Sequence, residues 1–255
     1  FQSYPYESGL LAPHARATVS ESVMNGWSRH MADDVLEQSI RTIGDRIVTR
    51  LEGTSVARER ALAETRQIVR MSANAIRAVH RNDFDEAERL LQQARDMQDA
   101  LANELRDYPN IYWSGYVQDA QKELAEAHIV LGIISGGGIP DPSTLKVEDA
   151  VFLNGLGEAA SELRRYILDA LRRSDPSRTE DLLATMDEVY VLLVSVDFPD
   201  AVTGGLRRTT DMLRGVLERT RGDLTVSMQQ RSLLDALDRA EQRLGMPDTG
   251  HTTDQ

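Results

Sequence analysis

A helical spacing of apolar residues recurs along almost the whole chain, and it is the feature that most constrains the fold. Apolar residues three to four positions apart line one face of an α-helix, whereas a half-buried strand alternates at every second residue. No strand-like segment of useful length interrupts the helical pattern. The sequence therefore predicts an all-α protein. The segments with helical spacing are 31–79 (two helices, or one interrupted at Gly53-Thr54-Ser55), 84–105, 111–134, 147–173, 179–196, 205–221 and 224–244.

Short breaker sequences separate these segments, among them Ser135–Pro140 and Ser174-Asp175-Pro176. Short connections between long helices favour one antiparallel bundle of about seven helices over residues 31–244. Nothing recurs at a fixed period, so a helical solenoid is not expected. Residues 1–30 carry Pro, Gly and Ser without a period and precede a plausible start at Met31, so we expect a disordered or non-native extension there and a disordered tail at 245–255.

Composition narrows the function classes. The chain has no cysteine, which excludes thiol nucleophiles, zinc–thiolate sites and disulfides and favours a reducing, cytoplasmic setting. The longest apolar runs, at 129–134 and 189–196, are far shorter than the roughly 18 residues of a membrane span, so no membrane association is expected. With 41 acidic and 29 basic residues, the net charge is -12. A negative charge is the wrong sign for a protein whose whole surface coats nucleic acid, but it does not exclude a local basic groove.

Two pairs of glutamates lie on successive long helices. Glu123 and Glu126 are three residues apart, and Glu158 and Glu162 are four apart, so each pair projects from one helix face. Small and apolar neighbours predict that both faces are buried, and antiparallel packing would bring the four carboxylates together. Oxygen-only ligands suit Mg²⁺ or Mn²⁺, which permit metal-assisted cleavage of a phosphodiester.

Spacing alone does not decide between a metal site and ordinary helix faces, on which glutamate is common. A di-iron bundle would need Glu-x-x-His pairs. His128 lies two residues after Glu126, and His80 lies three after Arg77, so neither completes that motif. No P-loop, nucleophile elbow, H-E-x-x-H or dinucleotide motif is present.

Basic and aromatic residues form three further candidates for nucleic-acid contact. One stripe spans about 60° of arc on a single helix, a second local basic excess lies at 203–221, and the loop 108–116 holds three tyrosines and a tryptophan. Arginine suits bidentate phosphate contacts, and aromatic rings suit base stacking. Solvated faces, intersubunit ion pairs and packing of the helix entry are the alternatives. The candidate residues are Arg66, Arg70, Arg77, Arg81, Tyr112, Trp113, Arg207 and Arg214.

Four segments taken together resemble the translin family, in register over about residues 56–244. They are RQIVRMSANAIRAVHRNDFDEAERLL at 66–91, KELAEAHIVLGII at 122–134, LNGLGEAASELRR at 153–165 and LRRTTDMLRGVLERTRGDL at 206–224. The chain looks like an archaeal-type member. The resemblance implies a seven-helix fold that assembles into a hollow homo-oligomer, an octamer, with single-stranded RNA or DNA inside.

The resemblance also distinguishes the branches of that family. In the catalytic branch, that of translin-associated factor X, the pattern E-x-x-E-A is matched here at 123–127. Its second pattern, G-x-x-D-x-x-x-E-L, is matched at 155–163, with Glu158 in place of the aspartate. In the translin branch that position is apolar. The resemblance therefore implies an Mg²⁺- (or Mn²⁺-) dependent endoribonuclease whose catalytic and metal residues are Glu123, Glu126, Glu158 and Glu162, and a basic inner wall that grips the nucleic-acid backbone.

Three other functions remain open on the sequence. The first is a noncatalytic single-strand-binding module of the same fold, in which the glutamates only form structural hydrogen bonds. The second is a structural bundle or adaptor whose arginines make intersubunit ion pairs. The third is a carboxylate–metal bundle that hydrolyses a small molecule, which would need a nucleotide-sized pocket.

Overall fold

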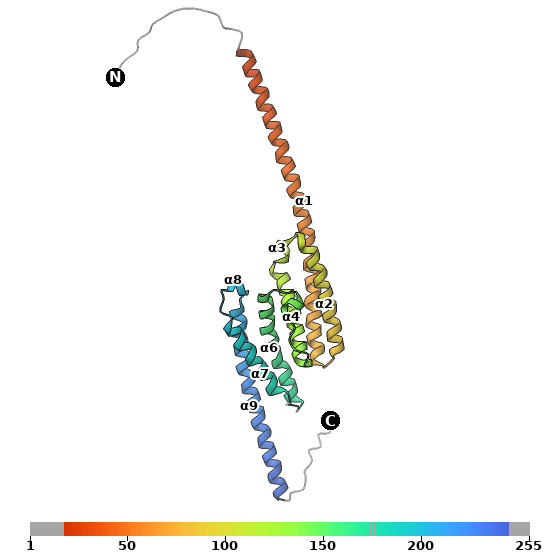
Figure 1. Cartoon of the computed structure of the whole chain (residues 1–255), viewed down its shortest axis with the longest axis vertical. Coiled ribbons are helices and arrows are strands. Elements are labelled where there is room, and N and C mark those ends of the chain that lie inside the picture. The colour runs from red at the N-terminus through yellow and green to blue at the C-terminus, as the bar shows by residue number, and fades with distance from the viewer. Residues whose placement is uncertain (1–17, 174, 176, 245–255) are drawn as a thin grey trace, which may run out of the picture. The chain divides into compact units, whose positions relative to one another are not determined.

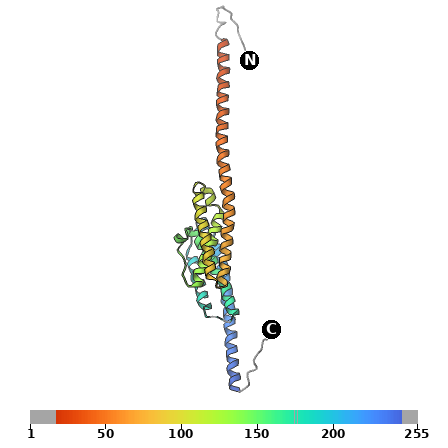
Figure 2. The same cartoon turned by 90° about the vertical axis from the view of Figure 1, so that its right-hand side faces the viewer.

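The computed structural model describes residues 18–173, 175 and 177–244, and this part of the chain is helical without a strand (Figures 1 and 2). The all-α prediction is confirmed. A 3₁₀ turn at Leu105–Asp107 follows the second helix. The helices are α1 (Thr18–His80), α2 (Phe84–Glu104), α3 (Pro109–Tyr112), α4 (Gly115–Ser135), α5 (Pro142–Leu145), α6 (Asp149–Arg172), α7 (Thr179–Ser195), α8 (Asp200–Thr203) and α9 (Leu206–Leu244).

Two expected helix breaks are wrong, because α1 and α9 are each continuous. Helix α1 runs through Gly53-Thr54-Ser55, where the Thr54 hydroxyl donates to the carbonyl of Arg50 at 2.9 Å. Helix α9 likewise runs through Gly222. A glycine in a helix interior costs only about 1 kcal/mol, which the neighbouring turns outweigh. The described part therefore holds six long helices and three of four residues each.

The chain divides into two compact units, with the boundary inside α1 between Val56 and Ala57. In the described part, the first unit is the helical segment 18–56, so residues 31–56 of the expected domain belong to it. Residues 1–17 of the expected extension and the tail at 245–255 lie outside the described residues, whereas 18–30 are helical. No helix of the described part is both long and apolar enough to cross a membrane.

Large apolar side chains are exposed along the first unit. They are either adjacent or three to five residues apart. Such a row on a single helix has no core to enter within that unit. The exposed residues are Val35, Leu36, Ile40, Ile43, Ile47, Val48, Leu51 and Val56.

The second unit is a bundle in which α6 packs against α4, α7 and α9 (Figure 1). Its core consists mainly of aliphatic side chains and alanines. Gly155 of α6 has no space for a larger side chain, because an added Cβ would lie 3.0 Å from the Lys122 carbonyl oxygen and 3.3 Å from the Ala125 Cβ. The backbones of α4 and α6 therefore approach closely at this point.

Gly157, two residues further along α6, makes the equivalent close contact with α7 and α9. An added Cβ would lie 2.6 Å from Cγ2 of Thr209 and 2.9 Å from Cδ1 of Leu193. Thr209 is not free to turn, because its hydroxyl donates to Oδ1 of Asn154 at 2.6 Å. Overpacking at this position must therefore displace a helix or break that hydrogen bond.

Gly157→Ala is expected to lower the free energy of unfolding by about 1–3 kcal/mol, the usual cost of overpacking a well-packed core. Gly115→Ala is the matched control, because Gly115 is also helical and nothing lies within 4 Å of its added Cβ. That control should be neutral or slightly stabilising. Urea unfolding followed by circular dichroism measures both variants, and equal stabilities would contradict the packing described here.

Candidate metal centre

Three of the four predicted glutamates come together between α4 and α6. One carboxylate oxygen each from Glu123, Glu126 and Glu158 lies within 4.8 Å of the other two. All three side chains are half-buried. The close contact at Gly155 produces this geometry. Gly155 precedes Glu158 by a little under one helical turn, so this contact holds the Glu158 part of α6 against α4. These three residues are called the carboxylate triad below.

Lys122, directly before Glu123 on α4, contacts the triad. Its Nζ lies 2.7 Å from Oε1 of Glu158 and 3.7 Å from Oε1 of Glu123. Burial disfavours the charged lysine, but the hydrogen bond and charge of Glu158, with Glu123 and Asp119, outweigh burial and raise the pKa of Lys122 above its ordinary value. The ammonium group thus stands in for part of the positive charge that the triad needs.

The triad remains short of positive charge even with Lys122 in place. Burial, and then the charges of Glu123, Glu158 and Glu162, raise the pKa of Glu126 from 4.5 to about 8. Burial, together with Glu158, also raises the pKa of Glu123. An all-oxygen donor set that resists ionisation without a further cation fits a hard divalent ion such as Mg²⁺ or Mn²⁺.

Glu162, the fourth predicted ligand, lies beside the triad but has a different partner. The ring Nε2–H of His80 donates to its Oε1 at 2.6 Å, and Arg165 lies 3.8 Å from the same oxygen. The His80 side chain is only 4% exposed, and its Nδ1 is buried without a hydrogen-bond partner among the described residues. The structure thus brings together three of the four carboxylates as one donor set and fixes the fourth through a histidine.

The sequence reasoning missed both His80 and Lys122. His80 is 82 residues from Glu162, so no local spacing could reveal the pair. His128 is not part of this group. Burial and the charge of Arg95 on α2 lower its pKa to about 4, and its Nε2 has no partner in the described part of the chain. It lies on a different face of α4 from Glu126.

The structure exposes the predicted arginines on two separate helices. Arg66, Arg70 and Arg77 lie on the part of α1 that belongs to the second unit, and Arg81 follows it. Within the described residues none of these four pairs with a carboxylate. On α9, Arg207 and Arg214 are exposed, and Arg214 lies 3.4 Å from Asp211.

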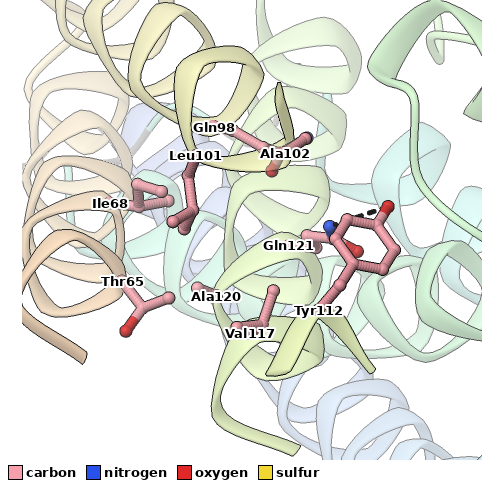
Figure 3. Close-up of a pocket in the computed structure, with 9 residues that line it drawn as sticks. All are labelled: Thr65, Ile68, Gln98, Leu101, Ala102, Tyr112, Val117, Ala120 and Gln121. Carbon is pink, nitrogen blue, oxygen red and sulfur yellow. Dashed lines mark hydrogen bonds between the residues drawn. The ribbon is translucent and has the colours of Figure 1, made fainter. Parts of the chain in front are cut away.

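Tyr112 and Trp113 have different environments. Trp113 is 56% exposed, whereas the Tyr112 ring lines a small internal cavity and its hydroxyl accepts a hydrogen bond from Nε2 of Gln121 (Figure 3). The cavity, between α1, α2, α3 and α4, has a volume of about 10 Å³. This volume is about that of one water molecule and is far too small for a nucleotide.

A larger open groove of about 550 Å³ lies against α6 and α9. Arg164, Arg165 and Arg172 line it, and Arg165 also approaches Glu162. Carboxylates offset much of the positive charge, because Asp223 lies 2.8 Å from Arg164 and Asp169 lies 3.4 Å from Arg172. The groove therefore places arginines next to the candidate centre, and the consecutive Arg164-Arg165 after Glu162 is the sequence feature that could have indicated it.

The chain is a helical bundle with a half-buried, oxygen-only triad between two adjacent helices. These features place it in the class of candidate carboxylate–metal proteins. The chain belongs to the translin family, as its similarity to the solved structure of AfC3PO shows. The two are 35% identical, with 73% of this chain and 97% of that one covered and a TM-score of 0.68. The predicted resemblance is confirmed.

Further comparisons agree with this assignment. AfC3PO in a complex with duplex RNA is 34% identical over the same shares of both chains, with a TM-score of 0.67. Apo-NeC3PO is 18% identical, covers 72% of this chain and 96% of its own, and shares the fold with a TM-score of 0.66. The uncharacterized protein MJ0175 of Methanocaldococcus jannaschii is 29% identical over 197 residues, 76% of this chain and 87% of that protein. No family model matches the chain.

The raised pKa of Glu126 predicts that the metal-free protein loses stability as the pH rises. The folded chain holds the Glu126 proton up to about pH 8 and the unfolded chain only to about pH 4.5, so folding takes up a proton between these values. The free energy of unfolding should fall by a few kcal/mol from pH 5 to pH 8 and level off above that. Urea unfolding in EDTA at pH 5, 7 and 9 measures this decline.

Glu126→Gln should flatten the decline and should be the more stable protein at pH 9, because an amide does not ionise. Glu188→Gln, on the exposed face of α7, removes the same charge away from the triad and serves as the control. A decline equally steep in wild type and Glu126→Gln would show that Glu126 ionises normally in the folded chain.

Proposed function

We propose that this protein binds RNA and cleaves its phosphodiester bonds with a divalent metal ion held by the carboxylate triad. The observation that carries the proposal is the triad itself, a half-buried set of three carboxylates that remains short of positive charge. The complex of AfC3PO with duplex RNA supports RNA as the ligand class, because that protein shares a third of its sequence with this chain.

In this proposal Glu123, Glu126 and Glu158 hold Mg²⁺ or Mn²⁺. When bound, the ion supplies polarisation of a phosphoryl oxygen and activation of water. Glu162 lies next to the triad and is fixed by His80 from α1, so it is positioned to accept the proton of the attacking water. The Glu158 side chain replaces the aspartate of the catalytic branch and keeps the charge on an arm that is longer by one methylene.

The arginines would hold the RNA backbone. Four exposed arginines on and after α1, without carboxylate partners in the described part, provide local positive charge in a chain of net charge -12. Arg164, Arg165 and Arg172 of the groove supply further guanidinium groups, each of which also lies near a carboxylate. Trp113 is exposed enough to stack on a base, whereas Tyr112 lies in the wall of the small cavity. We propose that the chain assembles into a hollow homo-oligomer, an octamer, and that single-stranded RNA or DNA lies inside.

Purified protein with Mg²⁺ should cleave a labelled single-stranded RNA, and EDTA should abolish cleavage. Glu123→Ala/Glu158→Ala should lose at least about 100-fold in rate while it still assembles, because two of the three metal ligands are gone. Light scattering of both proteins reports the oligomer, and duplex RNA and single-stranded DNA of the same sequence test the substrate class.

Cleavage that survives in the double variant, or in EDTA, would refute the metal centre. Binding without cleavage under Mg²⁺ and Mn²⁺ would establish the noncatalytic binding module, in which Lys122 and His80 are the structural partners of the glutamates. An absence of both binding at low salt and cleavage would refute the proposed function and leave only the fold.

Arg70→Ala/Arg77→Ala is expected to weaken RNA binding about tenfold and to reduce its dependence on salt concentration, because each lost phosphate contact lowers the number of released counterions by about one. Arg58→Ala is the control, since Arg58 is also exposed on α1 but lies outside the stripe and pairs with Glu59 at 2.8 Å. Fluorescence anisotropy at several salt concentrations measures both effects. Equal affinities for the wild type and the double variant would remove this stripe from the interface.

A further inference from the structure

Lys122 occupies an unusual place for a lysine in this chain. It is one of only two lysines, and it stands on α4 directly before a triad member. Its side chain is only 21% exposed and crosses to α6, where Nζ bonds Oε1 of Glu158. The other lysine, Lys146, forms a peripheral pair with Asp99 at 2.6 Å, with side chains that are 63% and 42% exposed.

The contacts of Lys122 involve the same side chains that a metal ion would use. Its ammonium group lies 2.7 Å from an oxygen of Glu158 and 3.7 Å from one of Glu123, and both residues belong to the triad. An ammonium group is a compact charge that donates three hydrogen bonds and coordinates no metal. A divalent ion held by these oxygens would lie within a few ångströms of Nζ, and the two positive charges would repel each other.

The Lys122 ammonium group can also reach a second position, at the rim of the site. Its four-carbon stem is flexible, and the side chain is partly exposed at the edge of the triad. Release from Glu158 would leave the ammonium group at the rim of the site. A phosphate group that approaches the triad would meet it there, and lysine binds phosphate as a point charge.

We propose that Lys122 is the internal counterion of the metal-free triad, that a divalent ion displaces it from Glu158 and Glu123, and that the displaced ammonium group then contacts a phosphate of the substrate. This inference rests on the proposed function, because it assumes that the triad binds a metal ion. It assigns to Lys122 two successive partners, carboxylates before the metal binds and a phosphate afterwards.

The first test is a titration of the full chain with Mn²⁺, followed by electron paramagnetic resonance, in the wild type, Lys122→Met and Lys146→Met. Methionine keeps most of the length of the side chain and removes its charge. Lys122→Met should bind Mn²⁺ at least about tenfold more tightly, equivalent to about 1.4 kcal/mol, because the competing cation is gone. Lys146→Met should bind like the wild type, and competition with Mg²⁺ extends the comparison to that ion.

The outcomes separate this inference from the proposed function. Wild-type binding of Mn²⁺ with no gain, or a loss, in Lys122→Met would overturn the role of Lys122 as competitor and leave the metal centre standing. Binding by none of the three proteins would overturn the metal centre, and this inference with it. A gain in Lys146→Met equal to that in Lys122→Met would show a general charge effect and would also overturn the inference.

A second measurement uses the unmodified chain, so it does not depend on the folding of Lys122→Met. Brief acetylation with and without Mn²⁺, read by mass spectrometry, reports how accessible each lysine is, with Lys146 as the internal reference. An ammonium group that is mostly buried and bonded to Glu158 is less accessible to the reagent than the exposed Lys146. Metal binding should therefore raise the ratio of Lys122 to Lys146 acetylation several-fold, and an unchanged or lower ratio contradicts displacement.

The phosphate contact is tested at saturating Mg²⁺, where competition with metal no longer matters. Lys122→Met should raise the KM for RNA, or the Kd if RNA is bound without turnover, about five- to tenfold. Lys122→Arg should restore most of the affinity because it keeps the positive charge. Equal RNA affinity in all three proteins would overturn the phosphate contact, and so would a loss that arginine does not restore.

Discussion

The close approach of α4 and α6 is the constraint on which the site depends. Gly155 lets the two backbones meet, and the next turn of α6 then carries Glu158 against Glu123 and Glu126 of α4. The same contact half-buries the carboxylates, and burial in turn makes their charge costly. The ammonium group of Lys122 offsets part of this cost. The part that is not offset appears as the raised pKa of Glu126.

The distribution of charge makes the proposed RNA ligand compatible with an acidic protein. The chain as a whole is acidic, but exposed arginines on α1 and α9, and the arginines of the groove beside α6, supply positive charge locally. The acidic chain as a whole can repel a polyanion while clusters of arginine attract it locally. The two effects are compatible because electrostatic fields decay over about 8 Å at physiological ionic strength. The proposed binding would therefore be confined to surfaces where several arginines act together.

Local patterns predicted much of this structure, and long-range contacts produced the rest. Apolar spacing identified the long helices, and the two glutamate pairs identified the facing surfaces of α4 and α6. The expected breaks in α1 and α9 failed because a single glycine is too weak a signal against strong helical context. The partners of Glu158 and Glu162 come from residues 36 and 82 positions away, so they depend on tertiary packing that no spacing rule encodes.

The contact between Lys122 and the triad has a consequence for biosynthesis. A cluster of carboxylates that required an external ion to pack would tie completion of the fold to the metal supply of the cell. Here an amino group from the same chain reaches the cluster as soon as α4 and α6 dock. The newly made polypeptide can therefore complete its bundle without an external ion, and the proposed metal would bind later, to the folded chain.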